Sequence, residues 1–341
     1  MKKLFVTGAA GFIGSAFVRL VLAEFPDCEV ISFDALTYAG NLDNLSGLDL
    51  RRHHFVRGDI TDRAAILAAL EEDVDAVVNF AAESHVDRSI LSSGPFLTTN
   101  IIGTQMLLDA ARERGVPRFV QISTDEVMGS LPDNENAFFT EKSPLEPNSP
   151  YAASKAAAEH LVRAAHHTFG VDTVITRCGN NYGPRQFPEK FLPLVITNSL
   201  RDEPIPLYGD GQNIRDWIYV DDHCRAILGI MAEGRAGAVY NIGSRNQRRN
   251  IEVAKSVLNE LGKPHSLIRF VNDRLGHDRR YAIDPSLAES ELAWRPLETW
   301  ESGLRKTIDW YRRNPKWVER ARSGEYREYY AQQYGAEVGA A

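Results

Sequence analysis

The chain has 341 residues, of which 43% are hydrophobic and 25% are charged. This composition is typical of globular proteins and excludes a wholly disordered or fibrous chain. Because one hydrophobic core seldom serves so many residues, we expect one large domain with a smaller lobe. The 46 acidic residues outnumber the 39 basic ones, and the net charge of −7 disfavours nucleic acid or anionic lipid as a partner.

Three cysteines, Cys28, Cys178 and Cys224, are too few and too scattered for a disulfide framework, and they favour a reducing, cytoplasmic location. No run of roughly 18 apolar residues predicts a membrane-spanning helix. Glycines from Gly8 onward interrupt the apolar start of the chain before a secretory signal could be complete. No histidines and acids have the spacing of metal ligands, so we predict no metal.

Short β-rich runs alternate with helical patterns through the first half of the chain, which predicts a Rossmann-type, doubly wound parallel sheet. The expected strands are residues 3–7, 30–34, 54–56, 76–80, 119–123 and 173–178. Apolar residues at three- and four-residue spacing predict helices at residues 13–24, 64–71, 100–114 and 151–169. We therefore expect helices on both faces of the sheet.

The character of the sequence changes after Cys178, where prolines, glycines and asparagines predict the start of the smaller lobe. Strands are expected at residues 216–220 and 238–242, with a helix at 221–231 between them. We therefore assign residues 1–178, rejoined by about 214–243, to the first domain, and residues 179–213 and 244–334 to a smaller C-terminal lobe. Beyond it, helix is expected from residue 251 and over 302–330, irregular structure at 274–277, and a flexible tail at 335–341.

Gly8, Gly11 and Gly14 lie between the first expected strand and the first expected helix. In this context, glycines let the backbone turn tightly and approach a pyrophosphate at the helix N-terminus. The second strand ends at Asp34, 20 residues beyond Gly14, where a carboxylate accepts hydrogen bonds from ribose hydroxyls and repels a 2′-phosphate. The pattern predicts dinucleotide binding, with NAD rather than NADP as the cofactor.

Two further loops are expected beside this cofactor. Asp59 and Ile60 follow the third strand and would border the adenine, although a solvated carboxylate at the start of a turn explains Asp59 nearly as well. The small residues Ala81 and Ala82 follow the fourth strand. Loops at the carboxyl ends of parallel strands line the ligand crevice in such sheets.

Tyr151 and Lys155 are four residues apart, so they share one face of an expected helix. Such a pair is usually surface decoration, but beside a dinucleotide fold it indicates catalysis. A cation within about 4–6 Å lowers the pKa of a neighbouring acid by roughly 1–3, so we expect Lys155 to bring the pKa of Tyr151 toward neutrality. The phenolate can then take a proton from an alcohol while a hydride leaves for the nicotinamide.

The three glycines together with the Tyr151-xxx-Lys155 pair resemble the extended short-chain dehydrogenase/reductase superfamily. Within it, the sequence resembles the dTDP-glucose 4,6-dehydratase family over nearly its whole length, through residues 34–41, 81–89, 123–127, 177–190 and 274–284. The resemblance implies cofactor contacts at Gly8, Gly11, Phe12, Ile13, Gly14, Asp34, Leu36, Thr37, Asp59, Ile60, Ala81, Ala82, Ser84, Thr99, Tyr151, Lys155 and Asn181.

The run Thr124-Asp125-Glu126 distinguishes a dehydratase from a simple alcohol dehydrogenase. Once carbon 4 of a hexose is oxidised, a carboxylate can remove the proton on carbon 5 while a carboxylic acid protonates the hydroxyl leaving carbon 6. The resemblance implies that Glu126 is the base and Asp125 the acid. Neighbours on an extended strand point to opposite faces, so the chain must bend here; without the family match, a solvated strand edge would explain the acids better.

Thr124 could donate a hydrogen bond to the oxygen on carbon 4, or could simply be a satisfied strand-end hydroxyl. A nucleoside diphosphate needs local cations in an acidic protein, and Arg215 and Arg274 are the candidates. His277 is expected to bind substrate at most. The resemblance implies substrate contacts at Ser84, His85, Thr124, Asp125, Glu126, Asn180, Glu189, Lys190, Pro206, Tyr208, Arg215, Asn250, Asp273, Arg274, His277 and Tyr281.

Met128 stands where the family commonly has tyrosine, and Gly179 replaces a commoner serine, so the rate or sugar preference could differ. The expected reaction converts dTDP-D-glucose to its 4-keto-6-deoxy product. A 4-epimerase or decarboxylase of the same superfamily, or a non-catalytic NAD-binding protein, is the alternative. The resemblance also implies a homodimer, which the apolar faces of residues 100–114 and 151–169 permit, although these faces equally permit ordinary packing against the sheet. The strictness for thymidine and the later fate of the product stay open.

Overall fold

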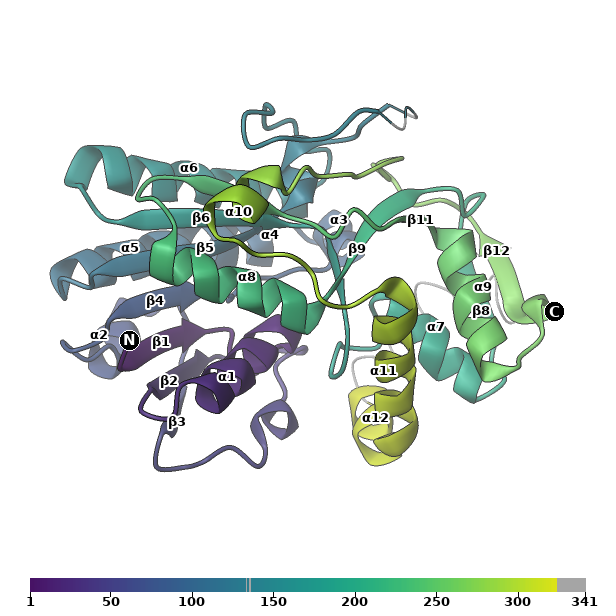
Figure 1. The fold of residues 1–341 in the computed structure, drawn as a ribbon, viewed down its shortest axis with the longest axis horizontal. Helices are drawn as coiled ribbons and strands as arrows, with labels where there is room; N and C mark the ends of the chain where they lie inside the picture. Colours follow the sequence, from purple (N-terminus) through teal and green to yellow (C-terminus); the bar gives the residue numbers. More distant parts are fainter. Residues whose placement is uncertain (133, 135, 324–341) are drawn as a thin grey trace.

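The structure is a computed structural model and describes residues 1–132, 134 and 136–323. Seven parallel strands form its central sheet in the order β10-β6-β5-β4-β1-β2-β3 (Figure 1). The strands are β1 (Lys3–Thr7), β2 (Glu29–Asp34), β3 (His53–Arg57), β4 (Ala76–Asn79), β5 (Arg118–Thr124), β6 (Thr173–Cys178) and β10 (Val239–Ile242). The expected Rossmann-type sheet is confirmed.

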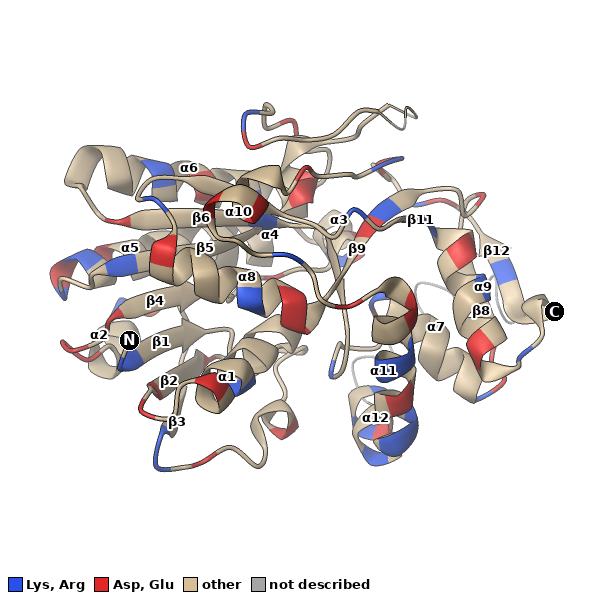
Figure 2. Cartoon of the chain, viewed as in Figure 1, with Lys and Arg blue, Asp and Glu red and all other residues tan. Residues whose placement is uncertain are grey.

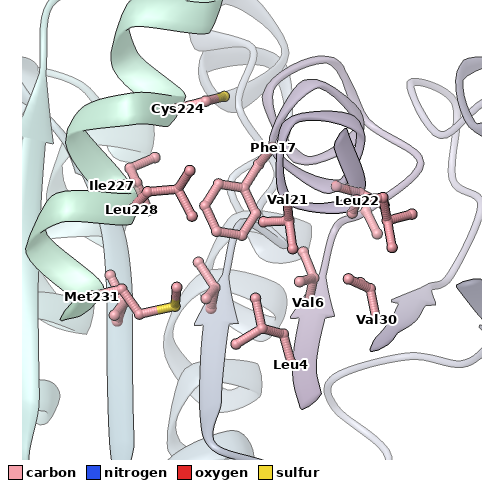
Figure 3. Close-up of a cluster of buried hydrophobic side chains, with 14 of the residues drawn as sticks. Leu4, Val6, Phe17, Val21, Leu22, Val30, Cys224, Ile227, Leu228 and Met231 are labelled. Atoms are coloured by element: carbon pink, nitrogen blue, oxygen red, sulfur yellow. The ribbon is translucent and has the colours of Figure 1, made fainter. Parts of the chain in front are cut away.

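Helices cover both faces of this sheet. On one face lie α1 (Phe12–Glu24) and α8 (Val220–Glu233), and on the other lie α2 (Arg63–Ala69), α5 (Thr104–Glu113) and α6 (Pro150–Phe169). Figure 3 shows Phe17 of α1 reaching toward Ile227 and Leu228 of α8 above the strands. Burying these side chains away from water fixes both helices on the sheet.

The segment after β4 is helical but irregular. It runs through α3 (Val86–Leu91), α4 (Gly94–Phe96) and a π-helical stretch (Leu97–Gly103) before α5 begins. Thr104 donates its hydroxyl to the carbonyl of Asn100 inside this run. The sequence predicted one ordinary helix over residues 100–114, because apolar spacing does not report a locally wider helical turn.

The smaller lobe has its own core. Its three-stranded sheet contains β7 (Asn180–Tyr182), β9 (Ile214–Tyr219) and β11 (Gln247–Arg249), and its two-stranded sheet pairs β8 (Ile205–Tyr208) with β12 (Ile268–Val271). Four helices complete its core: α7 (Phe191–Leu200), α9 (Asn250–Leu261), α11 (Trp300–Arg313) and α12 (Pro315–Ala321). A further helix, α10 (Ser286–Glu291), packs beside β10.

The chain returns from the lobe to the central sheet later than residue 214, where the sequence suggested the return. Helix α8 and strand β10 belong with the central sheet, whereas β9 pairs with β7 and β11 in the lobe. Strand periodicity cannot say which sheet a strand joins. The helix expected over 302–330 is observed as α11 and α12 and ends at Ala321, and residues 322–323 form a turn. Residues 324–330 and the expected tail at 335–341 lie outside the described residues.

The end of the lobe returns to the first domain. The indole nitrogen of Trp317 in α12 donates to Asn44 Oδ1 at 2.9 Å, and Asn44 in turn donates to the carbonyl of Ala10. Helix α11 carries both acidic and basic residues (Figure 2). Within the described residues, no helix is both long and apolar enough to cross a membrane.

We predict that Glu159→Gln lowers the free energy of unfolding by about 3–5 kcal/mol, because it leaves the guanidinium of Arg177 buried without its counter-ion. The pair is bidentate, with Nη2 2.7 Å from Oε2, and the two side chains are only 5% and 3% exposed. Denaturant unfolding measures the change. The control is Glu260→Gln, which breaks an exposed pair with Arg305 and should cost less than about 1 kcal/mol; equal losses would contradict the prediction.

Candidate active site

A cavity opens where the strand order reverses between β1 and β4, at the carboxyl ends of the strands. Ligands of such sheets bind at this switch point. The cavity is lined by Gly8, Gly11, Phe12, Ile13, Gly14, Phe33, Asp34, Ala35, Thr37, Ala39, Gly40, Gly58, Asp59, Ile60, Phe80, Ala81, Ala82, Glu83, Ser84, Thr99, Ile122, Ser123, Thr124, Asp125, Glu126, Tyr151, Lys155, Cys178, Gly179, Asn180, Asn181, Gln186, Phe187, Glu189 and Lys190.

The glycine loop is built for close backbone approach. Gly8 has a φ of +64°, and a Cβ there would lie 2.6 Å from the Ala81 nitrogen. A Cβ on Gly14 would lie 2.2 Å from the carbonyl oxygen of Gly8. Only glycine therefore allows α1 to begin so near the strand end, which leaves its N-terminus open to a pyrophosphate.

Asp34 lies at the end of β2 on the rim of the cavity. Its two carboxylate oxygens accept hydrogen bonds from the backbone amides of Ala10, at 2.9 Å, and Leu36, at 2.8 Å. These bonds fix a carboxylate where a dinucleotide's ribose would lie. The loop and Asp34 together fit a dinucleotide without a 2′-phosphate.

Nearly all the residues expected to contact the cofactor line the cavity, and Leu36 is the exception. Its backbone has a φ of +56°, and its side chain packs against the hydrophobic cluster beneath α1. The turn that lets its amide reach Asp34 directs the side chain into the core. Any contact between Leu36 and a cofactor is therefore confined to its backbone.

Tyr151 and Lys155 both lie on the cavity wall in the first turns of α6. The hydroxyl of Ser149 caps this helix by accepting from the Ala152 amide, and Pro150 occupies the first turn, so the helix begins just before the tyrosine. Lys155 donates from Nζ to the carbonyl of Ile122 at 2.6 Å, which ties α6 to β5. Burial lowers the pKa of Lys155 to about 8.

The expectation that Lys155 brings the pKa of Tyr151 toward neutrality is wrong for the protein alone. Burial raises the pKa of Tyr151 well above its ordinary value, and the nearby carboxylate of Glu126 raises it further, against a hydrogen bond with Thr124 that lowers it. The ammonium of Lys155 is bound to a backbone carbonyl. Four-residue spacing places the two groups on one face but does not show where the ammonium points.

The predicted bend at the two acids is confirmed. Strand β5 ends at Thr124, and a 3-10 turn (Asp125–Met128) begins at once, with the Thr124 hydroxyl accepting from the amide of Glu126. The turn brings both carboxyl groups to the cavity, where an extended strand would have sent them to opposite faces. Thr124 also donates to Asp125 Oδ1 at 3.3 Å.

The two carboxyl groups have different electrostatic surroundings. Burial and the charge of Glu126 raise the pKa of Asp125 well above its ordinary value. Burial also raises the pKa of Glu126, but the cations of Arg274, Arg215 and Lys190 oppose the increase. Of the two groups, Asp125 is thus the one whose surroundings favour the protonated form, and Glu126 is the one that neighbouring cations favour as a carboxylate.

The expected substrate residues lie in three places. Ser84, Asn180, Glu189 and Lys190 line the cavity with the acids, whereas His85 is buried at the N-cap of α3, outside the lining. Lys190 donates to the carbonyl of Ser84 at 2.5 Å. The others lie on the lobe, outside this lining: Pro206, Tyr208, Arg215, Asn250, Asp273, Arg274, His277 and Tyr281.

Lobe residues nevertheless meet near Glu126. The guanidinium of Arg215 lies 4.2 Å from the centre of the Tyr281 ring. The charge of Arg215 opposes the rise in the pKa of Glu126, and the charge of Glu126 in turn helps to raise the pKa of Tyr281. Arg274 forms an ion pair with Asp87 at 3.4 Å, and Tyr208 donates to the same carboxylate at 2.9 Å. The structure therefore brings Arg215 and Arg274 to the acid pair from separate segments.

The remaining lobe residues are held by local contacts. His277 is 2.6 Å from Asp273 through Nδ1, and burial lowers the pKa of His277 to about 4. Pro206 is buried in β8, and Asn250 begins α9. Sequence reasoning missed Asp87 and the cavity residues Glu83, Gln186 and Phe187. Asp87 lies within residues 81–89, one of the segments that resemble the dehydratase family, and this resemblance could have indicated it as a site residue.

The two departures from the family pattern have local explanations. Met128 is buried in a hydrophobic cluster outside the cavity lining, with its sulfur 3.6 Å from Arg177 Nη1. A Cβ on Gly179 would lie 2.7 Å from the carbonyl oxygen of Asp216, so a larger residue requires the backbone at Gly179 and the backbone at Asp216 to move apart. Among the described residues, no cluster of three or more histidines, cysteines and acids could hold a metal ion.

The chain matches known proteins over nearly its whole length. The family model described as GDP-mannose 4,6 dehydratase matches residues 5–307. The dTDP-glucose 4,6-dehydratase of Xanthomonas campestris pv. campestris is 50% identical over 347 residues, covering 96% of this chain and 98% of the relative. The Salmonella typhimurium dTDP-glucose 4,6-dehydratase is 47% identical over 357 residues, covering 97% and 99%.

Solved structures agree with this relationship. The dTDP-glucose 4,6-dehydratase DesIV from Streptomyces venezuelae, crystallised with NAD, is 51% identical with a TM-score of 0.91, covering 94% of this chain and 99% of that one. The UDP-glucose 4-epimerase of Thermus thermophilus, also crystallised with NAD, is 31% identical with a TM-score of 0.85, covering 91% and 99%.

The fold, the glycine loop after β1 and the pair Tyr151 and Lys155 together define a protein of the extended short-chain dehydrogenase/reductase class. Within this class, the chain belongs to the nucleotide-sugar dehydratase family whose model it matches, among the dTDP-glucose 4,6-dehydratases. The family expected from the sequence is confirmed.

We predict that the stability of the ligand-free protein, relative to that of Lys155→Met, rises between about pH 8 and pH 10.5. In this window the unfolded lysine still binds a proton, but the folded one, with its pKa lowered from 10.5 to about 8, has lost it. Stability rises wherever the unfolded state binds more protons, so the gain is on the order of 3 kcal/mol over the window. Denaturant unfolding at a series of pH values measures the difference.

Lys155→Arg is the matched control, since a guanidinium keeps its charge throughout this range. Its stability relative to Lys155→Met should not change with pH. If the stability of the wild type relative to Lys155→Met is also constant, or falls as the pH rises, then burial does not lower the pKa of Lys155.

Proposed function

We propose that this protein is an NAD-dependent dTDP-glucose 4,6-dehydratase, which forms dTDP-4-keto-6-deoxy-D-glucose and water. The observation that carries the proposal is the presence of Asp125 and Glu126 on one cavity wall beside Tyr151, with cations directed at Glu126. Oxidation of an alcohol needs only one base, so the acid pair requires a second reaction. Relatives that bear the same name and a neighbour crystallised with NAD support this assignment.

The cavity residues would act on carbon 4 first. Thr124 lies close enough to the hydroxyl of Tyr151 to lower its pKa, and Tyr151 takes the proton of the 4-hydroxyl. When bound, NAD supplies the pyridinium that accepts a hydride from carbon 4 and later returns it to carbon 6, and its positive charge favours the phenolate. The glycine loop and Asp34 would hold its pyrophosphate and ribose.

The acid pair would then remove water. Glu126 takes the proton from carbon 5, which the new ketone has acidified, while Asp125 gives its proton to the hydroxyl that leaves carbon 6. The carbon–oxygen bond at carbon 6 breaks and a double bond forms between carbons 5 and 6. Return of the hydride to carbon 6, and of a proton from Glu126 to carbon 5, completes the product, so the cofactor is not consumed.

A 4-epimerase is the second candidate, because an NAD-bound epimerase shares this fold at 31% identity. Epimerisation needs the tyrosine and the cofactor but no acid that gives up a proton to a leaving hydroxyl. The buried Asp125, with its raised pKa, has no task in that reaction. The same reasoning disfavours a protein that only binds NAD.

We also propose a cytoplasmic homodimer. Four large apolar side chains, Ile90, Leu91, Leu97 and Ile102, are 37%, 59%, 48% and 51% exposed along the helical run from α3 to α5, which packs beside α6. Apolar residues gathered on one face often mark a contact surface. The three cysteines are unpaired, as a reducing compartment favours.

We predict that Tyr151→Phe and Glu126→Gln stop the reaction at different steps. Tyr151→Phe should prevent oxidation, so no NADH absorbance appears with dTDP-glucose. Glu126→Gln should allow some NADH to form but lower the rate of water loss by at least about 100-fold, because general-base catalysis contributes roughly 10²–10⁴. Rapid-mixing absorbance and product mass spectrometry follow the two steps.

Exchange with deuterated solvent gives an independent check. A carboxyl proton on Glu126 that exchanges with solvent before it returns places one deuterium on carbon 5 of the wild-type product, and Glu126→Gln should slow this incorporation together with elimination. Water loss at the wild-type rate in Glu126→Gln would refute the role of the base. An epimerised sugar as the product would favour the second candidate.

We predict that the double variant Leu97→Glu/Ile102→Glu is a monomer, because two charges buried in an apolar interface are not compensated. Light scattering should give a mass near the 38.1 kDa of one chain, and twice that for the wild type. The control is Leu297→Glu, which changes a leucine that is 69% exposed elsewhere. A wild-type monomer, or dissociation in the control as well, would contradict the proposed interface.

A further inference from the structure

A fully buried histidine lies behind the cavity wall and is not in contact with the cavity itself. His223, in the first turn of α8, places its Nδ1 atom 2.9 Å from Oδ1 of Asn181. Asn181 lines the cavity, and its Nδ2 atom lies 3.1 Å from the carbonyl oxygen of Gly179 and 3.3 Å from the sulfur of Cys178. The histidine therefore contacts the active-site wall through one side-chain amide.

Hydrogen-bond chemistry fixes every proton in this arrangement. The carbonyl of Gly179 can only accept, so the amide nitrogen of Asn181 must face it and the amide oxygen must face His223. An oxygen requires a donor opposite, so Nδ1 of His223 carries the hydrogen. Burial alone lowers the pKa of His223 to about 3, so the ring is neutral and its tautomer is set.

The wall that Asn181 holds is tightly constrained. Gly179 approaches the carbonyl of Asp216 so closely that no side chain fits, and Asn180 and Cys178 face the cavity on either side of it. The thiol of Cys178 lies close enough to Tyr151 and Lys155 to affect the pKa of both. Gln186, another wall residue, donates to the backbone carbonyl of Asn181 at 2.9 Å.

We propose that His223 is a positioning residue that fixes the Asn181 amide and, through it, the wall of residues 178–181 beside Tyr151, where the nicotinamide end of NAD would bind. The inference rests on the proposed function for the identity of the cofactor. Without the donor of His223, the amide of Asn181 can rotate, and its bonds to Gly179 and Cys178 are lost with it.

Two substitutions separate positioning from packing. His223→Asn keeps a side-chain N–H close to the place of Nδ1 but removes ring volume, whereas His223→Phe keeps the ring volume but has no donor. Positioning predicts that Phe weakens NAD binding and lowers kcat, each by about tenfold, as expected for loss of one buried hydrogen bond. It also predicts that Asn remains within about threefold of the wild type in both quantities.

NAD affinity is measured by titrating cofactor-depleted protein and following tryptophan fluorescence, with no sugar nucleotide present. Thermal unfolding of each variant is recorded alongside. If His223 only fills space, the order of the two variants is reversed: His223→Phe stays close to the wild type in NAD affinity and kcat, and His223→Asn is impaired. That order, or equal losses in both variants, would overturn the proposal.

Turnover of dTDP-glucose is measured on the same samples. If the wild type binds NAD but does not turn over this sugar, the proposed function fails while the binding comparison between Asn and Phe still tests His223.

Discussion

Two carboxyl groups on consecutive residues share one largely buried cavity wall, and this constraint organises the site. Like charges this close cannot both ionise easily in a medium of low dielectric constant, so the surroundings decide which one keeps its proton. Asp125 is enclosed by protein, which raises its pKa, and the charge of Glu126 raises that pKa further. Glu126 meets cations from three separate segments, at Arg274, Arg215 and Lys190. Under the proposed function, the acid and base roles are thus set by the fold around two residues of nearly identical chemistry.

The parallel sheet makes this pairing possible because it brings strand ends to one edge. Strand β5 delivers the two acids, the glycine loop after β1 leaves room for a dinucleotide, and α6 adds Tyr151 and Lys155 from the side. The turn after Thr124 is the local device that matters most, since one more extended residue would point a carboxyl group away from the cavity. The lobe contributes the cations, which no strand of the central sheet carries to this place.

The sequence could predict the parts of this site that depend on local pattern. Strand ends, glycine spacing and the one-face relation of Tyr151 and Lys155 follow from backbone geometry and periodicity. The pKa of Tyr151 could not be predicted, because it depends on burial and on Glu126, which is distant in sequence but close in the folded protein. The membership of β9 in the lobe and the inward turn of the Leu36 side chain depend on tertiary packing. Asp87 was missed because its partners, Tyr208 and Arg274, are more than a hundred residues away along the chain.

The cations of the lobe can serve both binding and chemistry under the proposed function. In the free protein, burial raises the pKa of Glu126, and the charges of Arg274, Arg215 and Lys190 oppose this rise, which favours the carboxylate but makes it a weaker base. A nucleoside diphosphate that pairs with Arg215 and Arg274 would offset part of their charge. The pKa of Glu126 would then rise in the complex, and the carboxylate would bind the carbon 5 proton more strongly once substrate is in place. The same ion pairs that hold the diphosphate would in this way increase the basicity of the group that acts on the sugar.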